Sequence, residues 1–328
     1  MSTIGLDIGG ANLKAAHEDG AVRTVAFALW SAPERLEAAL ARLVGALPPC
    51  DRLAVTMTAE LCDCFETKRD GVNHVLDAAT KIAGEREVRI WITDGCFVSP
   101  DEARAAPLGC AAANWHALAT WAAGRHLEGR SLLMDVGSTT TDLIPLARGC
   151  VAARGLTDAE RLATGELVYL GVRRTPLMAL GPSIGFRERV HGLMAERFAD
   201  TYDVFLLTGD LDERPHDTDS ADGRPLTRGH AAARLVRMIG ADLEMVSHDE
   251  ASALAEAFRA RALDRIASAV RPMGEFDRVI VSGGGAFLAV AAARSACPNA
   301  AVVRLADELG EVGAEAACAW AVARLAAQ

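Results

Sequence analysis

The stretch Met134 to Asp142 reads MDVGSTTTD and decides the fold expected for the whole chain. It places Asp135 at the end of a predicted apolar strand and Gly137 two residues further on. Hydroxyl side chains then precede a second apolar run, and the candidates among them for binding phosphate are Ser138, Thr139 and Thr140. Glycine lets a turn bring its backbone N–H groups close to an anion, and the hydroxyls add neutral donors. The stretch therefore predicts a β-hairpin whose tip holds a phosphate group.

The same pattern opens the chain, where residues Leu6 to Lys14 read LDIGGANLK. Asp7 ends a predicted strand, and the turn that follows contains Gly9, Gly10 and Asn12. An aspartate cannot bind phosphate directly, because like charges repel. We therefore expect Asp7 and Asp135 to hold a Mg²⁺ ion that bridges to phosphate oxygens. Two such hairpins, each opening a segment of domain size, indicate an internal repeat.

A third glycine-rich element lies near the C-terminus, where Arg278 to Phe287 reads RVIVSGGGAF. An apolar strand leads into Gly283, Gly284 and Gly285, and an alanine-rich helix is predicted to follow. The free N–H groups at the start of such a helix suit an anion or the edge of a nucleotide. Each motif alone is compatible with a simple tight turn. Together they resemble the phosphate-1, phosphate-2 and adenosine motifs of the sugar kinase, hsp70 and actin superfamily.

This resemblance implies an α/β fold of two actin-like lobes, each ribonuclease H-like, around a central cleft. The length of 328 residues also exceeds one ordinary core and favours two domains. We place an N-terminal lobe at 1–127 and a C-terminal lobe at 128–328, with a helical insertion at about 190–275. Helices are predicted at 34–47, 70–82, 107–121, 194–207, 227–239, 248–270 and 313–327, the last of them packing against the glycines of the third motif.

Composition excludes several classes of partner. The net charge of −10 offers no basic surface for nucleic acid. Eight cysteines without a regular spacing fit buried thiols in a reducing cytosol. No apolar run is long enough for a membrane span, so we expect a cytoplasmic protein that acts on small molecules. Whether it forms a homo-oligomer is left open.

Charged residues at predicted strand ends are further candidates. Glu60 and Lys68 follow the predicted strand 52–58, at the edge where ligands bind in α/β sheets. For both, a solvated charged loop is the alternative. Arg174 lies in a polar connection after the central hairpin. Its planar guanidinium could bind a diphosphate through two hydrogen bonds. The alternative for the arginines of this connection is salt bridges to Asp158, Glu160 and Glu166.

A closer resemblance extends over essentially the whole chain. The runs that carry it are Gly5–Lys14, Thr56–Leu61, Asp135–Asp142 and Glu166–Pro176. They resemble the hydantoinase/oxoprolinase-like family of methanofuran biosynthesis, the APMF-Glu synthase family. The resemblance implies that the diphosphate ester of 5-(aminomethyl)-3-furanmethanol is joined to gamma-glutamyltyramine. Pyrophosphate leaves, an aryl ether forms, and ATP is not consumed.

The candidate residues are compatible with that reaction. Mg²⁺ on the two aspartates, the backbone donors of the glycine turns, and the charges of Lys14 and Arg174 would stabilise departing pyrophosphate. A phenol has an ordinary pKa of about 10, so a carboxylate should help to remove its proton. Glu60 and Asp142 are the candidates for this base.

Two alternatives belong to other functional classes. An ATP-dependent kinase or hydantoinase-type ATPase would use Gly283 to Gly285 to hold adenosine. A non-catalytic nucleotide sensor of the actin-like kind would bind ATP without turnover. Formation of ADP from ATP and Mg²⁺ would favour the kinase, whereas pyrophosphate release that depends on the tyramine conjugate would favour the synthase.

Overall fold

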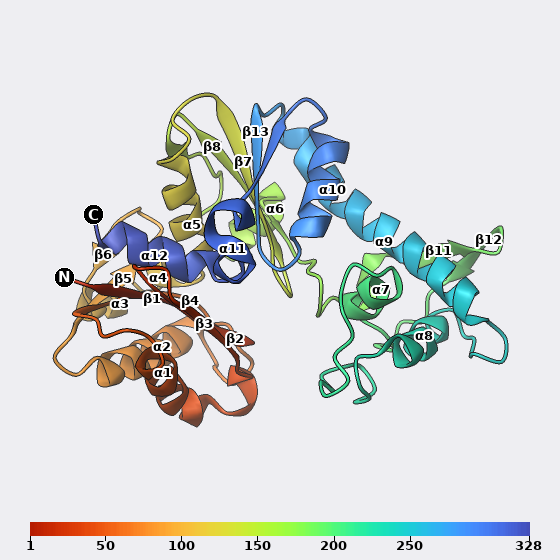
Figure 1. Ribbon diagram of the computed structural model, residues 1–328, viewed down its shortest axis with the longest axis horizontal. Helices are drawn as coiled ribbons and strands as arrows, with labels where there is room; N and C mark the ends of the chain where they lie inside the picture. The colour runs from red at the N-terminus through yellow and green to blue at the C-terminus, as the bar shows by residue number, and fades with distance from the viewer.

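The computed structural model describes residues 1–328 and contains two six-stranded α/β sheets (Figure 1). In the first sheet a β1–β2–β3 meander is antiparallel, β4 and β5 run parallel to β1, and β6 closes the edge. Its strands, in the spatial order β3-β2-β1-β4-β5-β6, are β1 (Thr3–Gly9), β2 (Asn12–His17), β3 (Val22–Ala26), β4 (Arg52–Thr58), β5 (Glu87–Trp91) and β6 (Phe97–Val98).

The second sheet repeats this plan, as the duplicated hairpin motif predicted. Strands β7 and β8 form an antiparallel hairpin, and β13 and β14 run parallel to β7. Its strands are β7 (Arg130–Val136), β8 (Thr141–Ala147), β9 (Cys150–Val151), β10 (Leu167–Val168), β13 (Arg278–Ser282) and β14 (Ala301–Arg304). The protein is thus an α/β protein with two mixed sheets, and each sheet contains one glycine-turn hairpin.

Helices cover both sheets and fill the space between them. Helices α1 (Leu36–Gly45) and α2 (Lys68–Ala83) cover one face of the first sheet, and α3 (Pro100–Ala105) and α4 (Pro107–Cys110) lie at its edge. The helices α5 (Asn114–Ala123) and α12 (Ala317–Ala326) pack against each other between the two sheets (Figure 1). On the second sheet lie α6 (Asp158–Thr164), α10 (Ala286–Ala296) and α11 (Ala306–Glu315).

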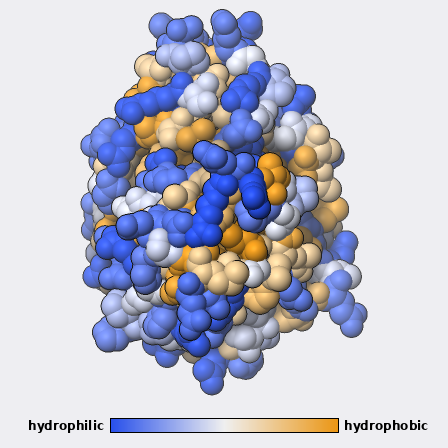
Figure 2. Space-filling view, turned by 90° about the vertical axis from the view of Figure 1, so that its right-hand side faces the viewer, coloured by the Kyte–Doolittle hydropathy of each residue, from blue (hydrophilic) through white to orange (hydrophobic).

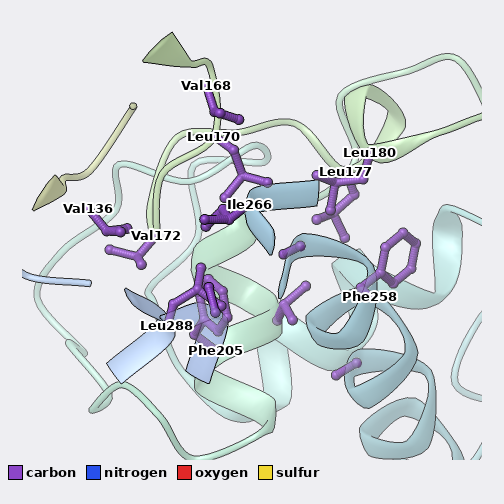
Figure 3. Packing of buried hydrophobic residues seen from close by; sticks show 14 of the residues in the cluster. Val136, Val168, Leu170, Val172, Leu177, Leu180, Phe205, Phe258, Ile266 and Leu288 are labelled. Carbon is purple, nitrogen blue, oxygen red and sulfur yellow. The ribbon is translucent and has the colours of Figure 1, made fainter. Parts of the chain in front are cut away.

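The segment between β10 and β13 extends to the right in Figure 1. It contains the hairpin β11 (Ser183–Phe186) and β12 (Arg189–Gly192), and the helices α7 (Thr201–Leu207), α8 (Arg228–Arg237) and α9 (His248–Val270). Figure 3 shows its apolar side chains packing with those of the second sheet, so that Phe205, Phe258 and Ile266 share one core with Val136 and Leu288. This shared core fixes the segment to the second sheet.

The far end of this segment faces the viewer in Figure 2. That face is mostly hydrophilic, with apolar atoms gathered near its middle. The exposed large hydrophobic side chains of the segment are Tyr169, Met178, Val190, Met194 and Met245. None of the helices combines the length and the apolarity that a membrane span requires.

Helix α12 packs unusually closely on β1. A Cβ atom at Gly5 would lie 2.0 Å from the carbonyl oxygen of Ala319 and 2.7 Å from the amide nitrogen of Ala323. Only glycine permits this approach, and the alanines of α12 bring its backbone down onto the strand. The last helix of the chain therefore belongs to the core beneath the first hairpin.

We expect the substitution Gly5→Ala to lower the free energy of unfolding by about 3 kcal/mol, because a methyl group would push α12 off β1. Chemical denaturation would measure the loss. Gly45→Ala is the matched control, since a methyl group at this exposed position of α1 would have no neighbouring atom within 4 Å. A Gly5→Ala protein as stable as the parent would contradict the close packing.

Several helix predictions were wrong in detail. The predicted helix 107–121 is interrupted at Ala112, which has a φ of +48°, and forms α4 and α5. Only Thr201–Leu207 of the predicted helix 194–207 is helical, because Met194 instead donates its N–H to the carbonyl oxygen of Met238. The predicted helix 313–327 is divided between α11 and α12, and α12 packs on the first sheet rather than on the glycines of the third motif.

The lobe boundaries at 127 and 128 stay a prediction. The first sheet ends before them and the second begins after them, although α12 lies against the first sheet. The segment expected at about 190–275 contains three helices, and the hairpin β11–β12 precedes them.

Candidate active site

The first hairpin forms a compact turn at the end of β1. A Cβ atom at Gly9 would lie 2.9 Å from the carbonyl oxygen of Asn12, so the turn needs a small residue there. At Gly10 a Cβ would lie 2.6 Å from Sγ of Cys62, which places that thiol against the turn. Below the turn, Asp7 and Lys14 are cross-strand partners on β1 and β2.

The second hairpin is held from behind by the chain segment that follows β10. The N–H groups of Arg173 and Arg174 both donate to the carbonyl oxygen of Ser138, over 3.0 and 2.9 Å. A Cβ at Gly171 would lie 2.4 Å from the amide nitrogen of Thr139, so this segment packs directly on the hairpin tip. Within the turn, the N–H of Gly137 donates to the carbonyl oxygen of Thr140 over 2.9 Å.

The third glycine motif packs on the base of the second hairpin. Gly283 has a φ of +85°, and a Cβ there would lie 2.6 Å from Oδ1 of Asp135. The N–H of Gly285 donates to the carbonyl oxygen of Val136 over 2.9 Å. A Cβ at Gly284, by contrast, would have no neighbouring atom within 4 Å. The motif thus leaves open space at its middle glycine.

The charges of the two aspartates predicted to bind the metal affect each other. Burial raises the pKa of Asp135 to about 6, and the charges of Asp142 and Asp7 add to this rise while Lys14 opposes it. Burial also raises the pKa of Asp7, opposed by Lys14 and by Asn114 of α5. Carboxylates from the two sheets therefore converge around one lysine.

Lys14 balances these buried carboxylates. Burial disfavours its charged form, but Asp7, Asp135 and Glu315 outweigh that cost and raise its pKa. Burial beside the same carboxylates raises the pKa of the Cys318 thiol on α12 far above its ordinary range. Lys14 is thus placed as a fixed positive charge between the hairpins.

The carboxylates could take part in holding Mg²⁺. Oδ1 of Asp7 and Oδ1 of Asp135 are both buried and have no hydrogen-bond partner. No three acidic, histidine or cysteine side chains are arranged to hold a metal by themselves. Magnesium commonly binds one or two carboxylates and completes its shell with water and phosphate oxygens, so the two free oxygens fit this use.

The two candidate bases have different surroundings. Asp142 accepts a 2.5 Å hydrogen bond from Arg161, a buried guanidinium that also lies 4.1 Å from the ring centroid of Trp115. Arg161, which packs on the Trp115 ring, therefore holds the Asp142 carboxylate in place. Sequence reasoning did not single out Arg161, because its partner is not close in sequence.

Glu60 is 1% exposed, and its Oε2 has no hydrogen-bond partner. Burial raises its pKa to about 7, although Lys68, with Nζ 3.8 Å from Oε1, opposes the rise. A Cβ at Gly71 would lie 2.2 Å from the Glu60 carbonyl oxygen, so α2 fixes its backbone. A carboxylate with a free oxygen and a pKa near neutrality suits a general base better than one bound to arginine.

Lys68 also connects the two sheets. Its Nζ lies 3.2 Å from Oδ2 of Asp158, the first residue of α6. The interpretation of Lys68 as only a solvated charge is therefore wrong. One of the alternative salt bridges of the polar connection forms, because Nε of Arg154 lies 3.6 Å from Oε1 of Glu166.

The adjacent Arg173 and Arg174 differ in their partners. Arg173 binds Asp217 at 2.8 Å and Asp219 at 3.3 Å, which holds the acidic loop of residues 216–223 in place. No acceptor contacts the guanidinium of Arg174, which lies 4.3 Å from the ring centroid of Trp30. Arg174 is therefore the arginine that is free to bind an anion.

Two surface hollows lie elsewhere in the molecule. One, of about 420 Å³, includes Trp121, His126 and Leu305, and the other, of about 810 Å³, includes His17, Arg324 and Gln328. Neither includes a residue of the three glycine motifs. The chemistry of the buried carboxylates, rather than the size of a hollow, identifies the candidate site.

The fold and this site define an α/β protein with two mixed sheets and a glycine-turn hairpin in each of them. The chain belongs to the hydantoinase/oxoprolinase family, whose model matches residues 51–328.

Two synthases from methanogens are similar in sequence. Both are named (4-{4-[2-(gamma-L-glutamylamino)ethyl]phenoxymethyl}furan-2-yl)methanamine synthase. The protein from Methanocaldococcus jannaschii is 36% identical over 250 residues, covering 75% of this chain and 74% of that protein. The protein from Methanococcus vannielii is 32% identical over 164 residues, covering 49% of this chain and 73% of that protein. The chain is thus a homologue of the methanofuran-precursor synthases.

Solved structures that are similar to this chain are more distant in sequence. The activator of 2-hydroxyisocaproyl-CoA dehydratase from Clostridium difficile has a TM-score of 0.45 and 13% identity, covering 100% of this chain and 96% of that one. A ROK family protein from Streptococcus pneumoniae has a TM-score of 0.42 and 14% identity, covering 99% and 98%.

Proposed function

We propose that the protein is a transferase that condenses 5-(aminomethyl)-3-furanmethanol diphosphate with gamma-glutamyltyramine. The products are pyrophosphate and the aryl ether of a methanofuran precursor. The observation that carries this proposal is the 36% identity to the M. jannaschii synthase across three quarters of both chains. The name of that synthase describes a product in which a phenoxymethyl group joins the two halves.

The bond changes are a single substitution at carbon. The phenol oxygen forms a bond to the furan-bearing CH₂, the bond from that CH₂ to the diphosphate oxygen breaks, and pyrophosphate leaves with the electron pair. The phenol proton passes to a carboxylate. No oxidant, reductant or ATP is required.

The leaving group would lie between the two hairpin tips. Backbone N–H groups of the glycine turns and the hydroxyls of Ser138, Thr139 and Thr140 would donate to its oxygens, and Lys14 and Arg174 would balance its charge. Mg²⁺ bound by Asp7 and Asp135 would supply further positive charge to the departing diphosphate. Glu60 would accept the phenol proton, because its Oε2 is free and its pKa is near 7.

The test is a coupling assay with the synthetic furanmethyl diphosphate, gamma-glutamyltyramine and Mg²⁺. We expect the ether to be detected by mass spectrometry, with pyrophosphate released in equal amount. Release should depend on the tyramine conjugate. Failure to form the ether with both substrates at millimolar concentration would contradict the proposal.

An ATP-dependent kinase or hydantoinase-type ATPase is the second candidate. The observation that favours it is the open space at Gly284, beside the start of α10, where an adenosine could approach the backbone. Incubation with ATP and Mg²⁺ separates the two candidates, since ADP should form only in the second case.

A further inference from the structure

Trp30 and Arg174 follow strands of different sheets, β3 and β10, and meet beside the two hairpin tips. Trp30 lies in the 3₁₀ turn η1 (Leu29–Ser31), and the N–H of its neighbour Leu29 donates to the carbonyl oxygen of Gly10 over 2.9 Å. Arg174 is tied by its own N–H to Ser138 over 2.9 Å. Each side chain is thus attached to one hairpin.

The contact between them leaves both groups with unused binding capacity. The Trp30 residue is 37% exposed, although it is a large aromatic side chain. The guanidinium of Arg174 lies 4.3 Å from the ring centroid and has no acceptor. A cation–π contact at an exposed site is weak, whereas a bidentate hydrogen-bonded contact between arginine and phosphate is strong. A diphosphate at the hairpin tips would therefore draw Arg174 away from the ring.

Trp30 and Arg174 also lie near the loop that contains the proposed base, Glu60. Burial raises the pKa of the Cys62 thiol to about 11, with Glu60 adding to the rise and Arg174 opposing it. The thiol therefore lies within electrostatic reach of both charged groups, and its sulfur packs against Gly10. Sγ of Cys64, in the loop that follows Glu60, lies 3.9 Å from the carbonyl oxygen of Leu29, so this loop contacts the turn that contains Trp30.

We propose that Trp30 is the binding platform for the aromatic ring of the diphosphate substrate, and that Arg174 covers this platform until a diphosphate attracts it. The proposal rests on the proposed function for the identity of the ring, a furan. Trp30 then stacks on the ring, while Arg174 binds the diphosphate. Binding thus replaces the contact between Arg174 and Trp30 with two others: Arg174 to the diphosphate and Trp30 to the furan ring.

The test compares three ligands by calorimetry with Mg²⁺ present: pyrophosphate, n-pentyl diphosphate and furanmethyl diphosphate. In the parent protein, furanmethyl diphosphate should bind about tenfold more tightly than the pentyl compound, because stacking on an aromatic side chain favours a flat ring. Trp30→Ala should remove this preference without weakening pyrophosphate binding, because Arg174 then has no ring contact to give up. Trp30→Phe should keep most of the preference.

Arg174→Ala provides the contrasting variant. It should weaken all three ligands by a similar factor, because it removes a diphosphate contact and not a ring contact. Pyrophosphate should also change the tryptophan fluorescence of the parent, and this change should be absent in Trp30→Phe.

Retention of the ring preference by Trp30→Ala would overturn the inference even if the coupling reaction is confirmed. A ring preference lost in Trp30→Ala would support the inference even if no ether forms. The two proposals can therefore fail separately.

Discussion

Replacing Asp135 with asparagine is expected to reduce the rate of ether formation by about a thousandfold, because it removes a carboxylate that would hold Mg²⁺ against the leaving group. The side chain keeps its size, so the packing against Gly283 is preserved. Steady-state kinetics over a range of Mg²⁺ concentrations would measure the loss. Asp264→Asn is the matched control, since that exposed carboxylate on α9 binds Arg271 and belongs to none of the glycine motifs.

The same substitution should stabilise the fold at neutral pH. Burial raises the pKa of Asp135 from 3.8 to about 6, so between these values the folded protein holds a proton that the unfolded chain has lost. The contribution of Asp135 to the free energy of unfolding therefore falls as pH rises from about 4 to 6, by about 3 kcal/mol. Asp135→Asn lacks this loss, so it should be more stable than the parent above pH 6 and similar below pH 4.

Lower activity together with higher stability would identify Asp135 as a residue retained for chemistry at a cost to the fold. Denaturation at pH 4 and pH 8 would measure the second effect. Full activity of Asp135→Asn at low Mg²⁺ would remove the metal role, and an unchanged stability difference between the two pH values would contradict the raised pKa.

Replacing Glu60 with glutamine is expected to slow coupling by about a hundredfold to a thousandfold, with little change in the affinity for diphosphate. Only the ionised carboxylate can accept the phenol proton. Because the pKa of Glu60 is about 7, kcat of the parent should rise as pH increases through 7 and then level off. This rise should be absent in Glu60→Gln. Single-turnover rates between pH 5.5 and 9 would show both effects.

Two further variants sharpen this test. Lys68→Met removes the ammonium 3.8 Å from Oε1, so the pKa of Glu60 should rise and the rate increase should move to higher pH. Glu66→Gln changes an exposed carboxylate of the same loop and should leave the profile unaltered. A pH profile of Glu60→Gln that matches the parent would show that another group accepts the proton.

The fold could be predicted from the sequence because its signals are local. An aspartate at a strand end, a glycine two residues later and short polar side chains define each hairpin within ten residues. Their repetition predicted two sheets with the same plan, and the structure contains them. Local signals also gave a wrong helix prediction. Residues 194–200 contain several good helix formers but form no helix, because the N–H of Met194 donates to the carbonyl oxygen of Met238 and Asp200 pairs with Pro176.

The sequence by itself therefore determined the two glycine hairpins, the positions of Asp7 and Asp135 at their bases, and the family. Tertiary structure alone decided the partners of the charged groups. It bound Asp142 to Arg161, left Arg174 free over Trp30, and placed Lys68 between Glu60 and Asp158. The physical reason is that glycine turns and strand periodicity are set by neighbouring residues. Burial and ion pairing depend on side chains that only the folded chain brings together.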